Sequence, residues 1–262
     1  MAEQLPAFLS HDDNKAVATA TIITASSANA TYPASNMKLL PITKVWRSVA
    51  AVLSSVTLLF DLGSAMTITA AGLVNANLTS AATLLLEAGT TSAVSDFSVT
   101  LSYVRLYDWI RWLSPSQSYR YWRFTLTDAA NGDNYLEVGY PILGNATVLT
   151  SAQAYGWHQI TEYFNQSPRS EFGVRNTAQM WDRMRFSFDL RNKAAAEVTT
   201  FRTIYTTAKM DVTPLLFIPD TSTPTHDGFF GVFTRPFDRV KNFRDDVSME
   251  FVTESSGKKV VA

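Results

Sequence analysis

The chain has 262 residues, of which 46% are hydrophobic and 17% charged, with a formal net charge of −1 and no cysteine. Its hydrophobic content is ample for packed cores and excludes a disordered chain, while its length fits two domains or one large β domain. The near-neutral charge without a lysine or arginine block argues against a nucleic-acid binder, and the missing cysteines exclude disulfides and thiolate metal sites.

The start of the chain and its apolar runs predict a water-soluble protein. Residues 1–6 lack the basic segment and following apolar segment that a secretory signal peptide requires. No apolar run approaches the roughly 20 residues of a membrane-spanning helix. We therefore expect a protein that is made in a reducing cytoplasm and has no membrane span.

The first half of the chain predicts short strands separated by turn-forming residues. Along residues 56–62, apolar side chains recur at every second position, which is the pattern of a strand with one buried face. Further expected strands lie at residues 19–24, 83–87, 97–103, 121–126 and 136–142. Short strands at this spacing, with no helix-length periodic segment between them, predict an antiparallel β-sandwich or barrel.

The composition changes near residues 145–160, which are weakly patterned and rich in Ala, Thr and Ser. We place a boundary there between two expected domains, residues 1–148 and residues 149–262. The second half differs in kind from the first because it contains one helical segment among its strands. That segment is expected at about residues 193–209, where apolar side chains recur at helical spacing.

The elements around this helix complete the expected second domain. Pro214 ends any continuation of the helix because proline cannot extend it. Expected strands lie at residues 184–190, 215–218, 228–233 and 247–252. The order predicts a small β-rich α+β domain with one helix, so the fold class of the whole chain is mainly β.

The sequence carries no recognisable catalytic or metal-binding motif. Three histidines, His11, His158 and His226, are scattered without the spacing of a metal-binding motif, and we interpret His226 as a solvated loop residue. The doublets Asp12-Asp13 and Asp245-Asp246 are not catalytic pairs, because neighbours on a strand point to opposite faces. A hydrolase would need a paired-carboxylate cleft, which nothing here favours. We expect no enzyme activity and no catalytic, cofactor-binding or metal-binding residues.

Three clusters mix aromatic and basic side chains, at residues 45–48, 107–112 and 119–124. Such a cluster can be a sugar platform, a protein interface or part of a sandwich core. For residues 119–124 the alternation favours a core on one face. Tyr107, Trp109 and Trp112 lie between expected strands, so we expect them to be exposed and to contact a protein partner or a glycan.

Several segments in order resemble the discoidin-like (galactose-binding-like) β-sandwich modules, in the version found in phage tail proteins. They are residues 30–37, 45–48, 60–63 and 72–79, followed by 121–126 and 135–139 as closing strands. The resemblance covers about residues 15–145. In the second half, residues 214–220, 231–233 and 248–255 are similar to the small β-rich domain of phage distal-tail and tail-tip proteins.

The resemblance implies a structural component of the virion, synthesised in the host cytoplasm, at a phage tail tip or baseplate. In such proteins the second domain forms a homo-oligomeric ring, such as a hexamer, that joins the tail tube protein to the tail-tip hub proteins. The outer sandwich decorates that ring. An alternative that shares the fold is a receptor-binding module of the virion that recognises a host cell-surface glycan.

Overall fold

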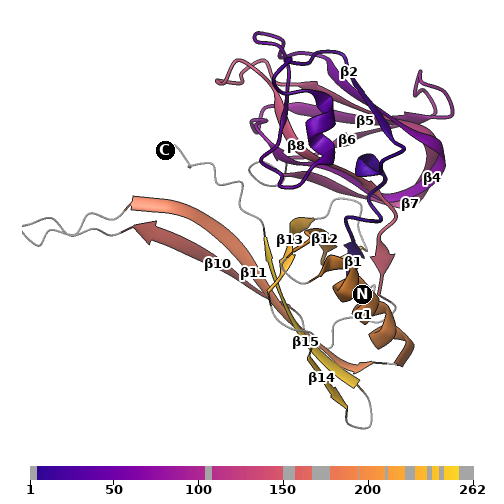
Figure 1. Ribbon diagram of the computed structural model, residues 1–262, viewed down its shortest axis with the longest axis vertical. Helices are drawn as coiled ribbons and strands as arrows, with labels where there is room; N and C mark the ends of the chain where they lie inside the picture. Colours follow the sequence, from indigo (N-terminus) through magenta and orange to yellow (C-terminus); the bar gives the residue numbers. More distant parts are fainter. Residues whose placement is uncertain are drawn as a thin grey trace, which may run out of the picture.

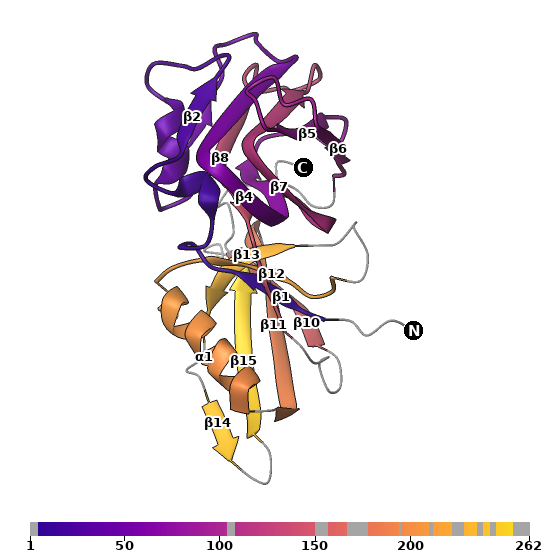
Figure 2. The same cartoon turned by 90° about the vertical axis from the view of Figure 1, so that its right-hand side faces the viewer.

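The computed structural model of the chain describes residues 5–103, 108–149, 157–166, 178–193, 195–209, 212–221, 228–234, 238–241 and 245–253. Within these ranges the chain forms two antiparallel sheets and one α-helix (Figures 1 and 2). The predicted mainly β class, with an antiparallel sandwich followed by a β-rich part with one helix, is confirmed. None of the helices in these ranges is long and apolar enough to span a membrane.

The strands of the sandwich form the first sheet. This sheet has seven strands, ordered β3-β8-β4-β7-β5-β6, and β2 pairs with β4. Its strands are β2 (Ile22–Ala25), β3 (Trp46–Arg47), β4 (Val56–Ala76), β5 (Thr83–Gly89), β6 (Phe97–Leu101), β7 (Trp109–Thr127) and β8 (Glu137–Gly144). The 3-10 turns η1 (Lys15–Val17) and η2 (Ala34–Lys38) precede β3. Strands β4 and β7 pair along most of their length, and their pairing shifts register after Asp61 and Ile68.

The second sheet has eight strands, ordered β10-β11-β15-β13-β12-β1-β9 with β14 beside β15. Its strands are β1 (Ala7–Leu9), β9 (Thr147–Val148), β10 (Trp157–Gln166), β11 (Ala178–Lys193), β12 (Leu215–Ile218), β13 (Phe229–Phe233), β14 (Asp238–Lys241) and β15 (Asp245–Thr253). Strand β1 pairs with β12 on one side and with β9 on the other. The chain of the sandwich therefore lies between β1 and β9, two neighbouring strands of the second sheet. The expected domain boundary at residue 148 stays a prediction.

Helix α1 (Ala195–Ala208), inside the expected range 193–209, covers one face of the second sheet (Figure 2). Its apolar stripe is Val198, Phe201 and Ile204, all buried. The ring of Phe201 meets the ring of Phe8 from β1 edge-on, with 5.3 Å between centroids. We call this cluster the helix core, and it consists of Phe8, Leu149, Phe186, Val198, Phe201, Ile204, Ala208, Leu215, Phe217, Phe229, Phe233 and Phe251.

The opposite face of the second sheet packs against the outside of the sandwich. The alternation of β12 places Phe217 toward the helix, whereas Leu216 and Ile218 face the sandwich. We call this second cluster the junction core, and it consists of Ala7, Leu9, Ile42, Ala70, Val74, Ile110, Trp112, Tyr140, Ile142, Ala146, Leu216, Ile218 and Phe230. Both the middle of the second sheet and strand β8 are thus buried on two faces, as the all-buried pattern of β8 records.

A third buried cluster, which we call the sandwich core, consists of Ala16, Met37, Trp46, Val56, Leu58, Phe60, Leu62, Ile68, Ala71, Leu73, Ala76, Leu78, Leu84, Leu86, Ala88, Leu101, Trp109, Leu113, Trp122, Phe124, Leu126, Leu136, Val138 and Leu143. One irregular residue lets β4 contribute to both the sandwich core and the junction core. Val74 belongs to the junction core and Ala76 to the sandwich core, although residues two apart on a regular strand share a face. Between them Asn75 has a φ of 54°, which breaks the alternation. Its partner is glycine for a steric reason, because a Cβ on Gly139 would lie 2.4 Å from the Ile42 carbonyl oxygen and 2.9 Å from the Asn75 Cβ.

Candidate functional site

The tryptophans expected at an interface are buried within the chain. Trp109 is 1% exposed and packs in the sandwich core, where its ring meets that of Tyr103 at 5.5 Å. Trp112 is 6% exposed and belongs to the junction core on the other side of β7. This corrects the expected exposure of both residues, because both faces of β7 are covered at these positions. Tyr107 lies outside the described residues.

Of the ionisable residues singled out in the sequence, His11, Asp12 and Asp13 have described side chains and are neighbours in the chain, whereas the side chains of Asp245 and Asp246 lie outside the described residues. Asp12 and Asp13 are exposed on the turn after β1, and His11 points into the junction. His226 lies outside the described residues, as does the side chain of His158. Among the described residues, no group of three or more His, Asp or Glu side chains could hold a metal ion.

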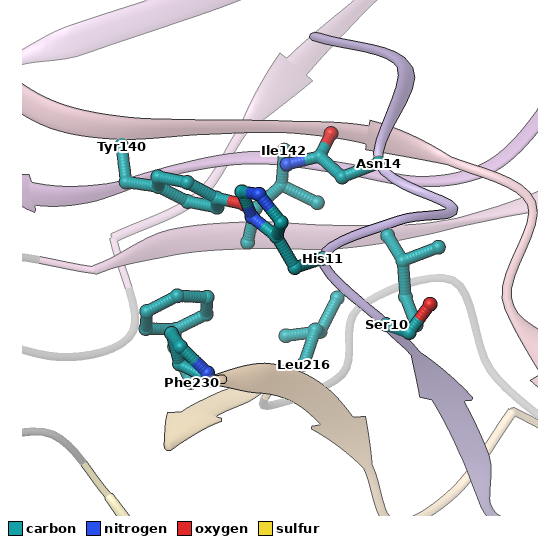
Figure 3. Close-up of a pocket in the computed structure, with 9 residues that line it drawn as sticks. Ser10, His11, Asn14, Tyr140, Ile142, Leu216 and Phe230 are labelled. Carbon is teal, nitrogen blue, oxygen red and sulfur yellow. The ribbon is translucent and has the colours of Figure 1, made fainter. Parts of the chain in front are cut away.

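A small pocket lies at the junction, between β8 and the turn that follows β1 (Figure 3). The Nδ1 atom of His11 lies 2.6 Å from the Tyr140 hydroxyl, and the two rings are stacked at 6.0 Å. Leu216 and Phe230 of the second sheet close the other side. Its volume of about 10 Å³ leaves room for about one water molecule, so the pocket is part of the packing and not a ligand site.

Hydrogen bonds tie the turn after β1 to strand β8. The side-chain amide of Asn14 donates to the Pro141 carbonyl at 2.8 Å, and its oxygen accepts from the Leu143 N–H at 3.0 Å. Burial lowers the pKa of His11, although nearby Asp12 opposes the shift. Burial also raises the pKa of Tyr140, so both groups are neutral near pH 7.

A second cluster, which we call the Arg47 stack, lies where β3 ends and β8 begins and consists of Tyr32, Arg47, Tyr135 and Glu137. The Arg47 guanidinium lies between two rings, 4.1 Å from the centroid of Tyr32 and 4.6 Å from that of Tyr135. Its Nε donates to a carboxylate oxygen of Glu137 at 2.6 Å, and that side chain is 2% exposed. The ion pair with this buried carboxylate holds the partly exposed guanidinium in place, while both tyrosines keep part of their surface in solvent.

An exposed apolar loop runs beside the Arg47 stack. Val49 is 48% exposed and Val52 is 38% exposed. The Ala51 N–H donates to the Asn134 carbonyl at 2.8 Å, which ties the loop to the residue before Tyr135. The sequence drew attention to residues 45–48 through Trp46 and Arg47, but the contribution of Tyr32 and Glu137 depends on pairing across the fold.

The second sheet carries an elongated ribbon, formed by β10 and β11 (Figure 1). Strand β15 pairs with β11 only from Arg185 to Lys193, so the part of β11 before Arg185 pairs with β10 alone. Glu162 of β10 accepts from Arg183 at 2.7 Å and from Arg185 at 2.6 Å. The pKa of Glu162 is lowered by these two hydrogen bonds.

No protein-family model matches this sequence, and no curated protein matches it. Solved structures do match, at low identity. One is a family 32 carbohydrate-binding module from Clostridium perfringens, with 16% identity over 50% of this chain and 97% of that chain and a TM-score of 0.39. Another is the family 32 module of C. perfringens NanJ in complex with galactose, with 9% identity over 53% of this chain and 99% of that chain and a TM-score of 0.41. A third is a fucose-binding module of Streptococcus pneumoniae, with 12% identity over 51% of this chain and 96% of that chain and a TM-score of 0.41. Each likeness is one of fold.

The half-buried His11 predicts a pH-dependent stability. Its pKa in the folded chain lies below the unfolded value of 6.5, so the unfolded chain takes up the proton first as the pH falls. The stabilising contribution of neutral His11 to the free energy of unfolding is therefore complete above pH 6.5. It is lost as the pH falls from 6.5 through the lower pKa of the folded chain. In urea unfolding, the free energy of the wild type should fall more than that of His11→Asn between about pH 7.5 and about pH 5.5. Equal losses in both proteins would contradict the assignment.

Proposed function

We propose that this chain is a non-enzymatic structural protein of the virion, located at a phage tail tip or baseplate. In this proposal its second sheet assembles into a homo-oligomeric ring, such as a hexamer, that joins the tail tube protein to tail-tip hub proteins. The sandwich is carried on the outside of the ring. The phage assignment is supported by the sequence resemblance, and the assembly role by the ribbon of β10 and β11.

The ribbon favours assembly because it is long and because part of β11 pairs with β10 alone. The residues of β11 from Ala178 to Met184 pair with β10 and have no strand on their other side within the described chain. A two-stranded hairpin is marginally stable in water unless a further strand or a packed surface covers it. A second copy of the chain that packs on the ribbon would supply that cover.

Both edges of the second sheet also favour association. An edge strand presents unpaired N–H and C=O groups to any incoming strand, and long edges are usually blunted or covered. In the described part of the chain, β10 is such an edge and carries Ile160, which is 42% exposed. The opposite edge is β9, whose Val148 is 36% exposed. Contacts between two different edges are head-to-tail contacts, which close into a ring when the rotation between copies permits.

The junction core supports the outward display of the sandwich. Large apolar side chains from both sheets, including Trp112, Tyr140 and Phe230, are buried in it. The two parts therefore move as one packed unit. A ring built from the second sheet would hold every sandwich in the same orientation.

Charge placed on the ribbon should weaken assembly. We expect Ile160→Lys to weaken self-association by at least about tenfold, because an exposed lysine on an edge strand opposes strand addition. Sedimentation velocity across a concentration series measures the effect. The matched control is Ile22→Lys, which alters a 63% exposed isoleucine on β2 of the sandwich and should assemble as the wild type does.

Two results would contradict the assembly role. One is a wild-type chain that stays monomeric at every concentration. The other is equal association of both lysine variants and the wild type, with unchanged melting temperatures showing that each is folded.

The location in the virion has its own test. Antibody raised against the purified chain should place gold particles at the distal end of tails in electron micrographs of phage particles. Antibody adsorbed beforehand with purified chain serves as the control. Gold that is absent from both intact and disrupted particles would remove the virion assignment, whatever the oligomeric state of the purified chain.

A second candidate function, host-glycan binding by the sandwich, is favoured by the Arg47 stack. Sugar rings stack on tyrosine faces, and guanidinium and amide groups bond their hydroxyls. The stack combines two partly exposed tyrosines with a guanidinium held by Glu137, and Asn134 beside it is exposed. A rigid set of this kind loses little conformational freedom when it binds a ligand.

Glycan binding through the Arg47 stack predicts that one tyrosine is essential. We expect the wild type to bind galactose- or fucose-terminated glycans and Tyr135→Ala to bind them at least about tenfold more weakly, because a stacking face is lost. The matched control is Tyr121→Ala, which removes a tyrosine that stacks on Arg120 at 4.8 Å on strand β7. Folded wild-type chain that binds nothing on a glycan array would count against this function.

A further inference from the structure

A groove of about 220 Å³ lies between α1 and the strands β1 and β9, and it shares Ser10 with the junction pocket. It is lined by Phe8, Ser10, Asp13, Thr147, Thr200, Thr203, Ile204 and Thr207. We infer that this groove is a binding site for a primary ammonium group, of the kind carried by an amino sugar or a lysine side chain. The inference is independent of the proposed function.

The helix side of the groove offers hydrogen-bond acceptors. The Thr200 hydroxyl donates its one hydrogen to the Ala196 carbonyl at 3.2 Å, and the Thr203 hydroxyl donates to the Thr199 carbonyl at 3.0 Å. Each hydroxyl then has lone pairs left and no hydrogen to give. A ligand that meets these two side chains must therefore supply the donors itself.

The strand side adds a fixed carboxylate. The Ser10 hydroxyl donates to one carboxylate oxygen of Asp13 at 2.7 Å and accepts from the Asp13 N–H at 3.2 Å. This reciprocal pair orients the carboxylate and uses the hydrogen of Ser10. Among the described residues, no hydrogen bond occupies the other carboxylate oxygen, so that oxygen can accept from a ligand.

The charge of the lining decides which donor fits best. Asp13 is the one charged side chain among the lining residues, and no lysine or arginine joins it there. An ammonium group has three donors, no acceptor and a positive charge, so it matches a negative lining rich in acceptors. A neutral hydroxyl brings one donor and no charge, and an anion would be repelled.

The size and the apolar floor of the groove suit the ammonium group of a ligand and not the whole of a large ligand. Phe8 and Ile204 form an apolar floor, 2% and 8% exposed, against which the carbon next to an ammonium can pack. The volume is smaller than the roughly 300–1,000 Å³ of sites that enclose drug-sized molecules. We therefore expect weak binding, in the millimolar range, of the amine-bearing end of a ligand.

The test is a titration of the full chain, followed by NMR, with four probes in separate arms. Glucosamine and Nα-acetyl-lysine amide carry the ammonium, whereas glucose and N-acetylglucosamine are neutral. We expect saturable shifts with the charged probes and none with the neutral ones. A response to one charged probe alone identifies the source of the ammonium. Equal responses to glucosamine and glucose, or no saturable response to either charged probe, would overturn the inference.

Substitutions locate the binding. Asp13→Asn should weaken binding of the charged probe by at least about tenfold, since it removes the only charge in the lining. Asp12→Asn is the matched control, because Asp12 is exposed next to Asp13 but does not line the groove. Thr203→Val removes an acceptor and leaves the Ser10–Asp13 pair intact, so it keeps the test decisive if Asp13→Asn does not fold. Equal affinities for the wild type, Asp12→Asn and Thr203→Val would place the binding elsewhere.

Discussion

The packing of the sandwich against the second sheet is the contact on which the rest of this structure depends. It buries the outer face of β8 and the face of β12 opposite the helix, so every residue of both strands is buried. Tyr140 of β8 packs on Phe230 of β13 with 5.0 Å between ring centroids. Because such interiors are close-packed, the two parts cannot rotate past each other without opening a core.

The same contact explains where irregular residues occur. The chain enters the sandwich from β1 and returns through β9, so two covalent connections and one apolar cluster hold the two sheets together. Strand β4 has to serve two cores, and the left-handed Asn75 opposite Gly139 makes this possible. His11 and Tyr140 contact each other at the junction, whereas the buried Oδ1 atom of Asn75 has no hydrogen-bond partner among the described residues. The pocket at the junction has a volume of only about 10 Å³, which is too small for a ligand.

Three features remain outside this packed body, and each leaves polar or apolar groups without full cover. The ribbon of β10 and β11 has an open edge, which suits strand pairing with another copy. The Arg47 stack presents partly exposed rings around a fixed cation, which suits a flat ligand. The groove beside α1 offers acceptors around Asp13, which suits a cation. The ribbon and the Arg47 stack lie on different strands, whereas the groove is lined in part by β9, the strand at the opposite edge of the second sheet.

The sequence by itself determined the local structure of this protein. The alternation at residues 56–62 and the helical stripe at 193–209 depend on neighbours along the chain. The helix forms within its expected range, and the expected strand forms as the first part of the longer strand β4 (Val56–Ala76). The tertiary structure alone decided what covers each face. Trp109 and Trp112 lie on opposite faces of β7, one in the sandwich core and the other in the junction core. The sequence pattern does not show that a second sheet covers the outer face of this strand. Contacts such as Arg47 with Glu137, 90 residues apart, depend on docking of distant strands, which no local pattern records.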